Sequence, residues 1–328
     1  MMHLLPKFLR QFLVGCAVLL CCTACSFLPS VESSPWELVQ LPTDATVLDV
    51  GFTSDQNHGW LTGTRSTLME TFDGGKTWEP RVLALGDTDY RFNAVSFSGN
   101  EGWLIGEPSI LLHTEDGGQS WSNIPLSAKL PGKPAKIVAV GPQSAELTTD
   151  VGAIYKTEDM GRHWNATVQE AFGVLRNVNR SPDGTYVAVS SRGSFYSIWN
   201  PGQPAWEPHN RNSSRRVQNM GFAPDGHLWM LARGGQVQFS NDNNEWDEPV
   251  TPDRSVGIGL LDLAYRTPNE LWITGGSGNL LCSSDGGKTW QKDRSVNKVG
   301  SNLYRVQFSS PNQGFVMGQS GVLLRYVG

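Results

Sequence analysis

The residues best suited to chemistry in this 328-residue chain are arginines that gather near its middle. Residues 162–233 hold eight arginines, no lysine and four acidic residues, whereas residues 32–160 hold eight basic and eighteen acidic residues. Arginine presents a planar fork of donors that matches carboxylates and carbonyls. The pattern predicts a patch that binds a protein partner, and a solvated basic rim is the alternative. Because the whole chain carries a net charge of −5, we expect no nucleic-acid partner.

A second group of residues suited to chemistry consists of aspartates in four copies of the motif Ser/Thr-x-Asp-x-Gly-x-Thr/Ser-Trp. We expect each aspartate to accept turn amides, the glycine to allow positive φ and the tryptophan to pack between repeats. His163 replaces the hydroxyl residue in one copy. These motifs are similar to the Asp boxes of bacterial neuraminidase repeats, which indicates a fold more strongly than an activity. The four aspartates are Asp73, Asp116, Asp159 and Asp285.

Catalytic arrangements are not recognisable in the sequence. Sialidase chemistry needs an arginine triad, an acid, and a tyrosine nucleophile with a glutamate partner. Spacing identifies no glutamate partner for the candidates Tyr155, Tyr186, Tyr196 and Tyr265. The histidines have no metal-ligand spacing, and no nucleophile elbow, phosphate loop or paired-carboxylate motif occurs. We therefore expect no catalytic site, metal or cofactor, with an exported propeller that binds or hydrolyses glycans as the alternative.

The strands that must position these residues belong to repeats, which are indicated by tryptophans that recur every 40 to 44 residues. Short β-rich runs with turn signals fill each interval, and no sustained helical stripe occurs. A period in the low forties with such strands indicates propeller blades of four strands. The tryptophans are Trp36, Trp78, Trp121, Trp164, Trp206, Trp246 and Trp290.

The two ends of the chain are expected to meet in the last blade. The seventh repeat begins near Leu303 and leaves no room for its own outer strand, which residues 36–40 can supply. Closure of this kind removes exposed sheet edges. We therefore predict an all-β fold in which residues 36–328 form one monomeric seven-bladed propeller of four-stranded antiparallel blades, with the N-terminal strand completing the last blade.

Strand topology predicts which face carries the arginines. In an up-and-down blade, the turn after the second strand and the connection to the next blade lie on one face, and the Asp boxes lie on the other. Arg180 stands in a column where other repeats place an aromatic residue. Six arginines are expected opposite the Asp boxes, namely Arg176, Arg192, Arg211, Arg215, Arg216 and Arg233.

The first 24 residues are typical of an export signal. Lys7 and Arg10 precede an apolar run over residues 12–20 that is short for a membrane span. The run ends at Thr23-Ala24-Cys25, which resembles a bacterial lipobox with Cys22 in place of the usual leucine. We expect cleavage before Cys25, its lipidation, and a tether over residues 25–35, so that acyl chains hold the protein on an extracytoplasmic membrane surface. The alternative is ordinary signal-peptide cleavage and release.

Together, the lipobox, tether, seven repeats, Asp boxes and central arginines resemble the photosystem II assembly and stability factor family of cyanobacteria and plastids. The resemblance covers essentially the whole chain. It implies a non-enzymatic factor, lipid-anchored on the lumenal face of the thylakoid membrane, that binds newly made reaction-centre core subunits and early assembly intermediates and promotes early complex formation and repair. By that resemblance Arg180 joins the six arginines above as a partner-binding residue.

Overall fold

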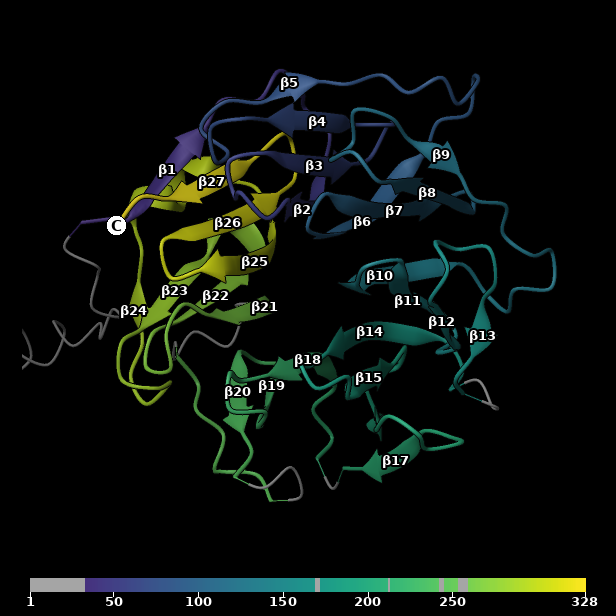
Figure 1. Ribbon diagram of the computed structural model, residues 1–328. Helices are drawn as coiled ribbons and strands as arrows, with labels where there is room; N and C mark the ends of the chain where they lie inside the picture. Colours follow the sequence, from purple (N-terminus) through teal and green to yellow (C-terminus); the bar gives the residue numbers. More distant parts are fainter. Residues whose placement is uncertain (1–32, 169–171, 212, 242–244, 253–258) are drawn as a thin grey trace, which may run out of the picture.

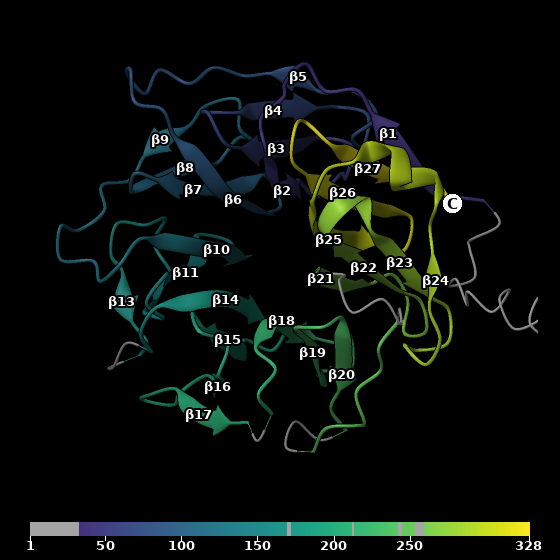
Figure 2. The same cartoon turned by 180° about the vertical axis from the view of Figure 1, so that it is seen from behind.

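The computed structural model describes residues 33–168, 172–211, 213–241, 245–252 and 259–328. These residues form seven antiparallel sheets arranged as a ring, seen from both sides in Figures 1 and 2. The predicted seven-bladed propeller is confirmed. The signal peptide, Cys25 and residues 25–32 of the predicted tether lie outside the described residues.

Each blade is named here by its strands A to D, counted from the centre of the ring outward. Blade 1 comprises β2 (Val47–Phe52), β3 (Gly59–Gly63), β4 (Leu68–Thr71) and β5 (Glu79–Pro80). Blade 2 comprises β6 (Arg91–Ser98), β7 (Glu101–Glu107), β8 (Ile110–Thr114) and β9 (Ser122–Asn123). Blade 3 comprises β10 (Pro134–Gly141), β11 (Ser144–Thr149), β12 (Ile154–Thr157) and β13 (Asn165–Ala166).

The second half of the ring repeats this order. Blade 4 comprises β14 (Leu175–Arg180), β15 (Tyr186–Ser190), β16 (Phe195–Trp199) and β17 (Glu207–Asn210). Blade 5 comprises β18 (Val217–Phe222), β19 (Leu228–Ala232) and β20 (Gln236–Phe239). Blade 6 comprises β21 (Leu260–Tyr265), β22 (Leu271–Gly275), β23 (Leu280–Ser283) and β24 (Gln291–Lys292), with short 3₁₀ helices η1 (Gly276–Gly278) and η2 (Ser295–Val299). Blade 7 comprises β25 (Leu303–Ser310), β26 (Gln313–Gly318), β27 (Leu323–Tyr326) and the N-terminal β1 (Trp36–Val39).

The ring is closed as predicted by β1, which pairs antiparallel with β27. The register places Trp36 opposite Tyr326 and Val39 opposite Leu323. Trp36 is buried, and its ring meets Trp272 and Tyr326 edge to face at centroid distances of 5.3 Å each. The two ends of the propeller are therefore joined by both strand pairing and aromatic packing.

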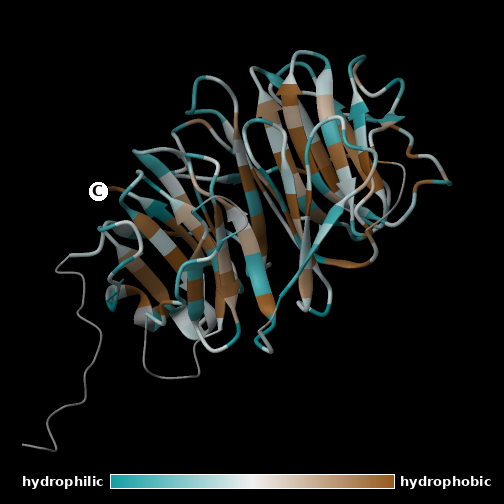
Figure 3. Ribbon diagram, turned by 90° about the horizontal axis from the view of Figure 1, so that it is seen from below, coloured by the Kyte–Doolittle hydropathy of each residue, from teal (hydrophilic) through white to brown (hydrophobic). Residues whose placement is uncertain are grey.

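The hydrophobic core lies between the blades rather than at the centre of the ring. Strand B of a blade is covered on both sides by neighbouring blades, so all five residues of β3, β15, β19 and β22 are buried. Apolar residues concentrate in the strands and polar residues at their ends (Figure 3). Of the repeat tryptophans, Trp78, Trp206 and Trp290 are buried as expected, like Trp36, while Trp121, Trp164 and Trp246 are half-buried.

Blade 5 departs from the predicted four strands. Its described residues form three strands, and the place of strand D is taken by two isolated bridges, Val237 to Val250 and Ser240 to Trp246. The sequence of this repeat has no Asp box and the shortest tryptophan interval, but loss of the box alone does not remove an outer strand, because blade 4 also lacks a box and keeps β17. In the part of the chain that the structure describes, no helix has the length and apolar character needed to cross a membrane.

Candidate functional site

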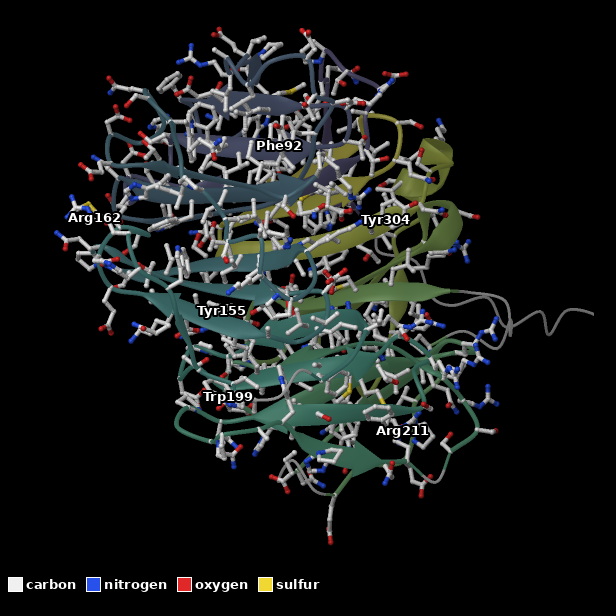
Figure 4. All side chains as sticks on the ribbon, turned by 90° about the vertical axis from the view of Figure 1, so that its right-hand side faces the viewer. Phe92, Tyr155, Arg162, Trp199, Arg211 and Tyr304 are labelled. Atoms are coloured by element: carbon white, nitrogen blue, oxygen red, sulfur yellow. The ribbon has the colours of Figure 1, made fainter. Side chains whose placement is uncertain are left out.

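Six of the seven predicted arginines are positioned by elements that meet at one face of blades 4 and 5. Arg192 and Arg233 lie in the B–C turns after β15 and β19, and Arg176 lies near the start of β14. Arg211, Arg215 and Arg216 lie in the connection from β17 to β18. We call these six residues the arginine face. In Figure 4 the ring is seen edge-on, with Arg211 on one side and Arg162, next to an Asp box, on the other.

Backbone and side-chain hydrogen bonds join the arginine face into one surface. The Arg233 amide donates to the Arg216 carbonyl at 2.9 Å, and Arg215 Nη1 donates to the Arg233 carbonyl at 3.4 Å. Arg211 Nη1 donates to the Arg215 carbonyl at 2.5 Å. Arg176 spans the seam to blade 5, because Nη1 reaches Gln218 Oε1 at 3.0 Å while Nη2 reaches the Ser191 carbonyl at 2.8 Å. Neutral acceptors thus hold three guanidinium groups in place.

The charge of the arginine face is not neutralised internally. Among the described residues, none of its six guanidinium groups lies within ion-pair distance of a carboxylate, whereas Arg180, Arg266 and Arg305 each have one. Five of the six side chains are exposed, and Arg211 is half-buried. Burial lowers the pKa of Arg211, yet arginine stays charged at neutral pH. The face therefore presents guanidinium donors whose natural complement is a carboxylate.

Two exposed side chains with apolar surface on this side of the ring had not been predicted, one beside the arginines in blade 4 and one in blade 7. Val174 is 61% exposed just before β14, and its carbonyl accepts the amide of Ser191. Tyr304 is 37% exposed in strand A of blade 7, and Figure 4 shows it on the same side of the ring as Arg211. The face therefore combines positive charge with apolar contact area, which is the composition of protein interfaces rich in arginine and tyrosine. Their exposure depends on the three-dimensional arrangement and left no signal in the sequence.

Arg180 is not part of the arginine face. It lies at the opposite end of β14, beside the A–B turn, where its Nε and Nη2 donate to Glu146 at 2.7 and 3.4 Å. Both side chains are 15% exposed. Burial acts to lower the pKa of Arg180, but the hydrogen bonds and charge of Glu146 outweigh it and raise that pKa. We leave Arg180 out of the arginine face because this guanidinium already has a carboxylate within the protein, and its predicted role in partner binding stays a prediction.

Tyr186 also has a glutamate partner, contrary to what spacing indicated. Its hydroxyl donates to Glu146 Oε2 at 2.8 Å across the seam between blades 3 and 4. The Tyr186 side chain is fully buried, and burial followed by the charge of Glu146 raises its pKa. A nucleophile needs a lowered pKa and access to substrate. This Tyr–Glu pair with one arginine therefore ties two blades together, and it lacks the access to substrate that the glycan-cleaving alternative requires.

The Asp boxes have the structural chemistry that the sequence predicts. Asp73 Oδ1 accepts the Thr77 amide at 3.0 Å and the Thr71 hydroxyl at 2.8 Å, while Oδ2 accepts the Thr77 hydroxyl at 2.7 Å. Although burial opposes it, these hydrogen bonds lower the pKa of Asp73 to about 2. His163 Nδ1 takes the place of the missing hydroxyl, 2.6 Å from Asp159 Oδ2. The pKa is lowered to about 2 in the other boxes as well, at Asp116, Asp159 and Asp285.

Four of the five histidines in the described residues pair with an acid, and the fifth, His209, stacks on Tyr196. His58 lies 2.7 Å from Glu70, and His113 lies 2.9 Å from Glu101. His113 is buried in β8. Within the described ranges, no group of three or more histidine, cysteine, aspartate or glutamate residues is arranged to hold a metal ion.

Comparison with known proteins shows the family to which the chain is similar. Residues 28–327 match the family model described as Photosynthesis system II assembly factor YCF48. The chain is 65% identical over 245 residues to the photosystem II assembly protein Ycf48 of Thermosynechococcus vestitus, covering 74% of this chain and 70% of the relative. It is 62% identical over 255 residues to the photosystem II assembly lipoprotein Ycf48 of Trichormus variabilis, covering 77% and 75%. A solved structure described as YCF48 bound to D1 peptide is 61% identical, with a TM-score of 0.89 over 92% of this chain and 100% of the other.

Proposed function

This chain belongs to the photosystem II assembly factor Ycf48 family, and on that premise we propose that it binds a photosystem II reaction-centre subunit through the arginine face. The observation that carries the proposal is the set of six neighbouring guanidinium groups without an internal carboxylate partner. The relative whose structure is described as bound to D1 peptide supports the class of partner.

Binding at this face follows from the way its arginines are held. Arg176, Arg211 and Arg215 donate to neutral acceptors, so their side chains are already partly ordered in the free protein. Binding therefore loses less side-chain conformational entropy. Their remaining donors, with those of Arg192, Arg216 and Arg233, face outward to receive carboxylates and backbone carbonyls. The uncompensated positive charge also speeds the encounter with an acidic segment. Val174 supplies apolar contact at its border, and Tyr304 adds exposed surface on the same side of the ring in blade 7.

The cellular role that we propose is that of a monomeric, non-enzymatic assembly factor. It holds newly made reaction-centre core subunits and early assembly intermediates during formation and repair of the complex. A lipid on Cys25 and a tether over residues 25–35 place the propeller at the lumenal face of the thylakoid membrane. The names of relatives as assembly lipoproteins support the anchor.

A charge-reversal experiment tests the binding surface. The full chain, the Arg215→Glu/Arg216→Glu variant and a Lys76→Glu/Lys288→Glu control are each used as anchored bait with detergent-solubilised native membranes. Both lysines are exposed in Asp boxes on the opposite face, so the control makes the same change in net charge away from the proposed site.

We expect the arginine variant to recover at least tenfold less reaction-centre subunit than the wild type and the lysine control to match the wild type. Thermal melts should be alike for all three chains, because none of the four residues has a carboxylate partner whose loss would unfold the propeller. Equal recovery by the arginine variant would refute the proposed surface.

A further inference from the structure

A ring of seven equivalent residues lines the centre of the propeller. In each blade the pairing of strand A with strand B skips one residue near the start of strand A, which marks a β-bulge. The residue just after this bulge is taken as the equivalent position; in blade 1, for example, it is Asp49, which pairs with Thr62. All seven residues line a cavity of about 730 Å³ that follows the central channel. In blade order they are Asp49, Ala94, Lys136, Asn177, Asn219, Asp262 and Arg305.

The two aspartates of this ring connect their blades to the next. Asp49 Oδ2 accepts the amide of Val95 in blade 2 at 3.1 Å, and Asp262 Oδ2 accepts the amide of Val306 in blade 7 at 3.1 Å. Each also has a side-chain partner, because Arg305 lies 3.0 Å from Asp49 and Asn219 donates to Asp262 at 2.8 Å. A carboxylate in this ring is thus held by the next blade's amide and by a donor side chain.

The seam between blades 2 and 3 has the next blade's amide and one donor side chain, Lys136, but no carboxylate of its own. Lys136 belongs to the following blade, whereas Arg305 and Asn219 belong to the blade before the aspartate that they contact, a position that Asp49 fills in this seam. Ala94 occupies the aspartate position, and the amide equivalent to those of Val95 and Val306 belongs to Ile137. Lys136 has no hydrogen bond or ion pair with any described residue, although it lines the same cavity. Burial, followed by repulsion from Arg305, lowers the pKa of Lys136 to about 8, as expected for an ammonium group without a close counter-ion.

We propose that the channel binds a carboxylate beside Ala94, held by the ammonium group of Lys136 and the backbone N–H of Ile137. The ligand carboxylate takes the place that Asp49 and Asp262 fill in their own seams. Its charge offsets that of Lys136, so this half-buried cation gains the partner that the described residues do not supply. The site needs a carboxylate on a small or narrow group, because it lies within the channel.

The cavity that holds this site extends to one residue of the arginine face, Arg176. Its lining includes Arg176, as well as Arg91 and Lys133, which lie just before or at the start of the inner strands of blades 2 and 3. Five basic and four acidic residues line the whole cavity, so its net charge does not repel an anion. The carboxylate therefore has two sources: a small free carboxylate, or an acidic group of the partner segment bound to the arginine face. The second source rests on the proposed function, whereas the site itself does not.

Thermal melts of the full chain in acetate test the site. Sodium acetate is exchanged for sodium chloride at constant ionic strength, at pH 7, with the wild type and Lys136→Gln. Since a ligand that binds the folded state raises Tm, we expect a saturable rise of about 2–4 °C in the wild type and none in Lys136→Gln. Equal effects of acetate and chloride, or an unchanged rise in Lys136→Gln, would overturn the proposal.

A second pair of variants supplies the carboxylate from the chain itself. Ala94→Asp should melt at a higher temperature than Ala94→Asn, which has the same shape without the charge, and acetate should no longer raise its Tm. An Ala94→Asp chain that is no more stable than Ala94→Asn would also overturn the proposal. If Ala94→Asp fails to fold, the proposal is still tested by comparing the acetate-dependent rise in Tm of the wild type with that of Lys136→Gln.

Partner capture distinguishes the two sources. If the partner carries the carboxylate, Ala94→Asp should recover several-fold less reaction-centre subunit than Ala94→Asn. If the carboxylate is a small free anion, the two variants should capture alike while their acetate responses still support the site. Failure of the arginine face itself is recognised separately, because Arg215→Glu/Arg216→Glu leaves the acetate response intact.

Discussion

Replacing Arg180 by alanine should destabilise the propeller without weakening partner binding by the folded protein. The change removes two hydrogen bonds to Glu146, at 2.7 and 3.4 Å, and one to the Ser181 carbonyl at 3.0 Å. Glu146 then keeps only the Tyr186 hydroxyl at 2.8 Å as a side-chain partner. Breaking a buried ion pair by removing one partner costs about 3–5 kcal/mol. Because both side chains are 15% exposed, water partly solvates the remaining carboxylate and we expect about 3 kcal/mol.

Urea unfolding followed by tryptophan fluorescence measures this change in the free energy of unfolding. Arg216→Ala is the matched control, since its exposed side chain makes no hydrogen bond or ion pair with a described residue and its loss should change stability by less than about 0.5 kcal/mol. Arg180→Lys keeps the charge but loses the paired donors, so it should fall between the two. A cost below about 1 kcal/mol for Arg180→Ala, or an equal cost for Arg216→Ala, would refute the assignment of Arg180 to blade packing.

Three further predictions concern the fold. The Asp-box carboxylates have a pKa of about 2 in the folded protein against an ordinary 3.8. Their ionised forms therefore stabilise the fold fully above about pH 4, and this stabilisation is lost as the pH falls toward 2. Melts should show a lower Tm at pH 2 than at pH 5, and a constant Tm over this range would contradict the prediction. Gly118→Ala should lower Tm by several degrees, because φ is +96° and the new Cβ would lie 2.4 Å from the Trp60 ring, and a melt like that of the wild type would count against this packing. Trp60→Ala should lower the free energy of unfolding in urea by about 3–5 kcal/mol, because Trp60 is fully buried. A loss under about 1 kcal/mol would contradict the view that Trp60 is a packing residue between blades.

The features that follow from local pattern were predictable from the sequence. The tryptophan period identified the blades, and the Asp-box residues specified the turns that their hydrogen bonds now show. The arrangement of the six arginines on one face followed from strand order alone. The irregular outer edge of the described part of blade 5 coincides with the shortest tryptophan interval, the one before Trp246, whereas the lost Asp box is no signal, because blade 4 lacks one too and keeps β17.

Contacts across the seams between blades could not be predicted in the same way. Arg180 and Tyr186 lie 34 and 40 residues from Glu146, close to one repeat, and become neighbours because adjacent blades pack face to face. A position-by-position comparison of repeats aligns Ala94 with the aspartates of blades 1 and 6 and with Lys, Asn or Arg in the other four blades. It would not have shown that Lys136 lacks a partner, because that depends on side-chain directions within the channel.

The most direct test of the central claim is a map of the partner's footprint on the propeller. Amide hydrogen exchange of the full chain is measured with and without a purified reaction-centre subunit. We expect slower exchange in the B–C turns at residues 191–194 and 233–235, where the arginine face is built, and unchanged exchange in the Asp-box turns. Protection of the Asp-box turns with no change at residues 191–194 and 233–235 would contradict the claim that the arginine face binds the partner.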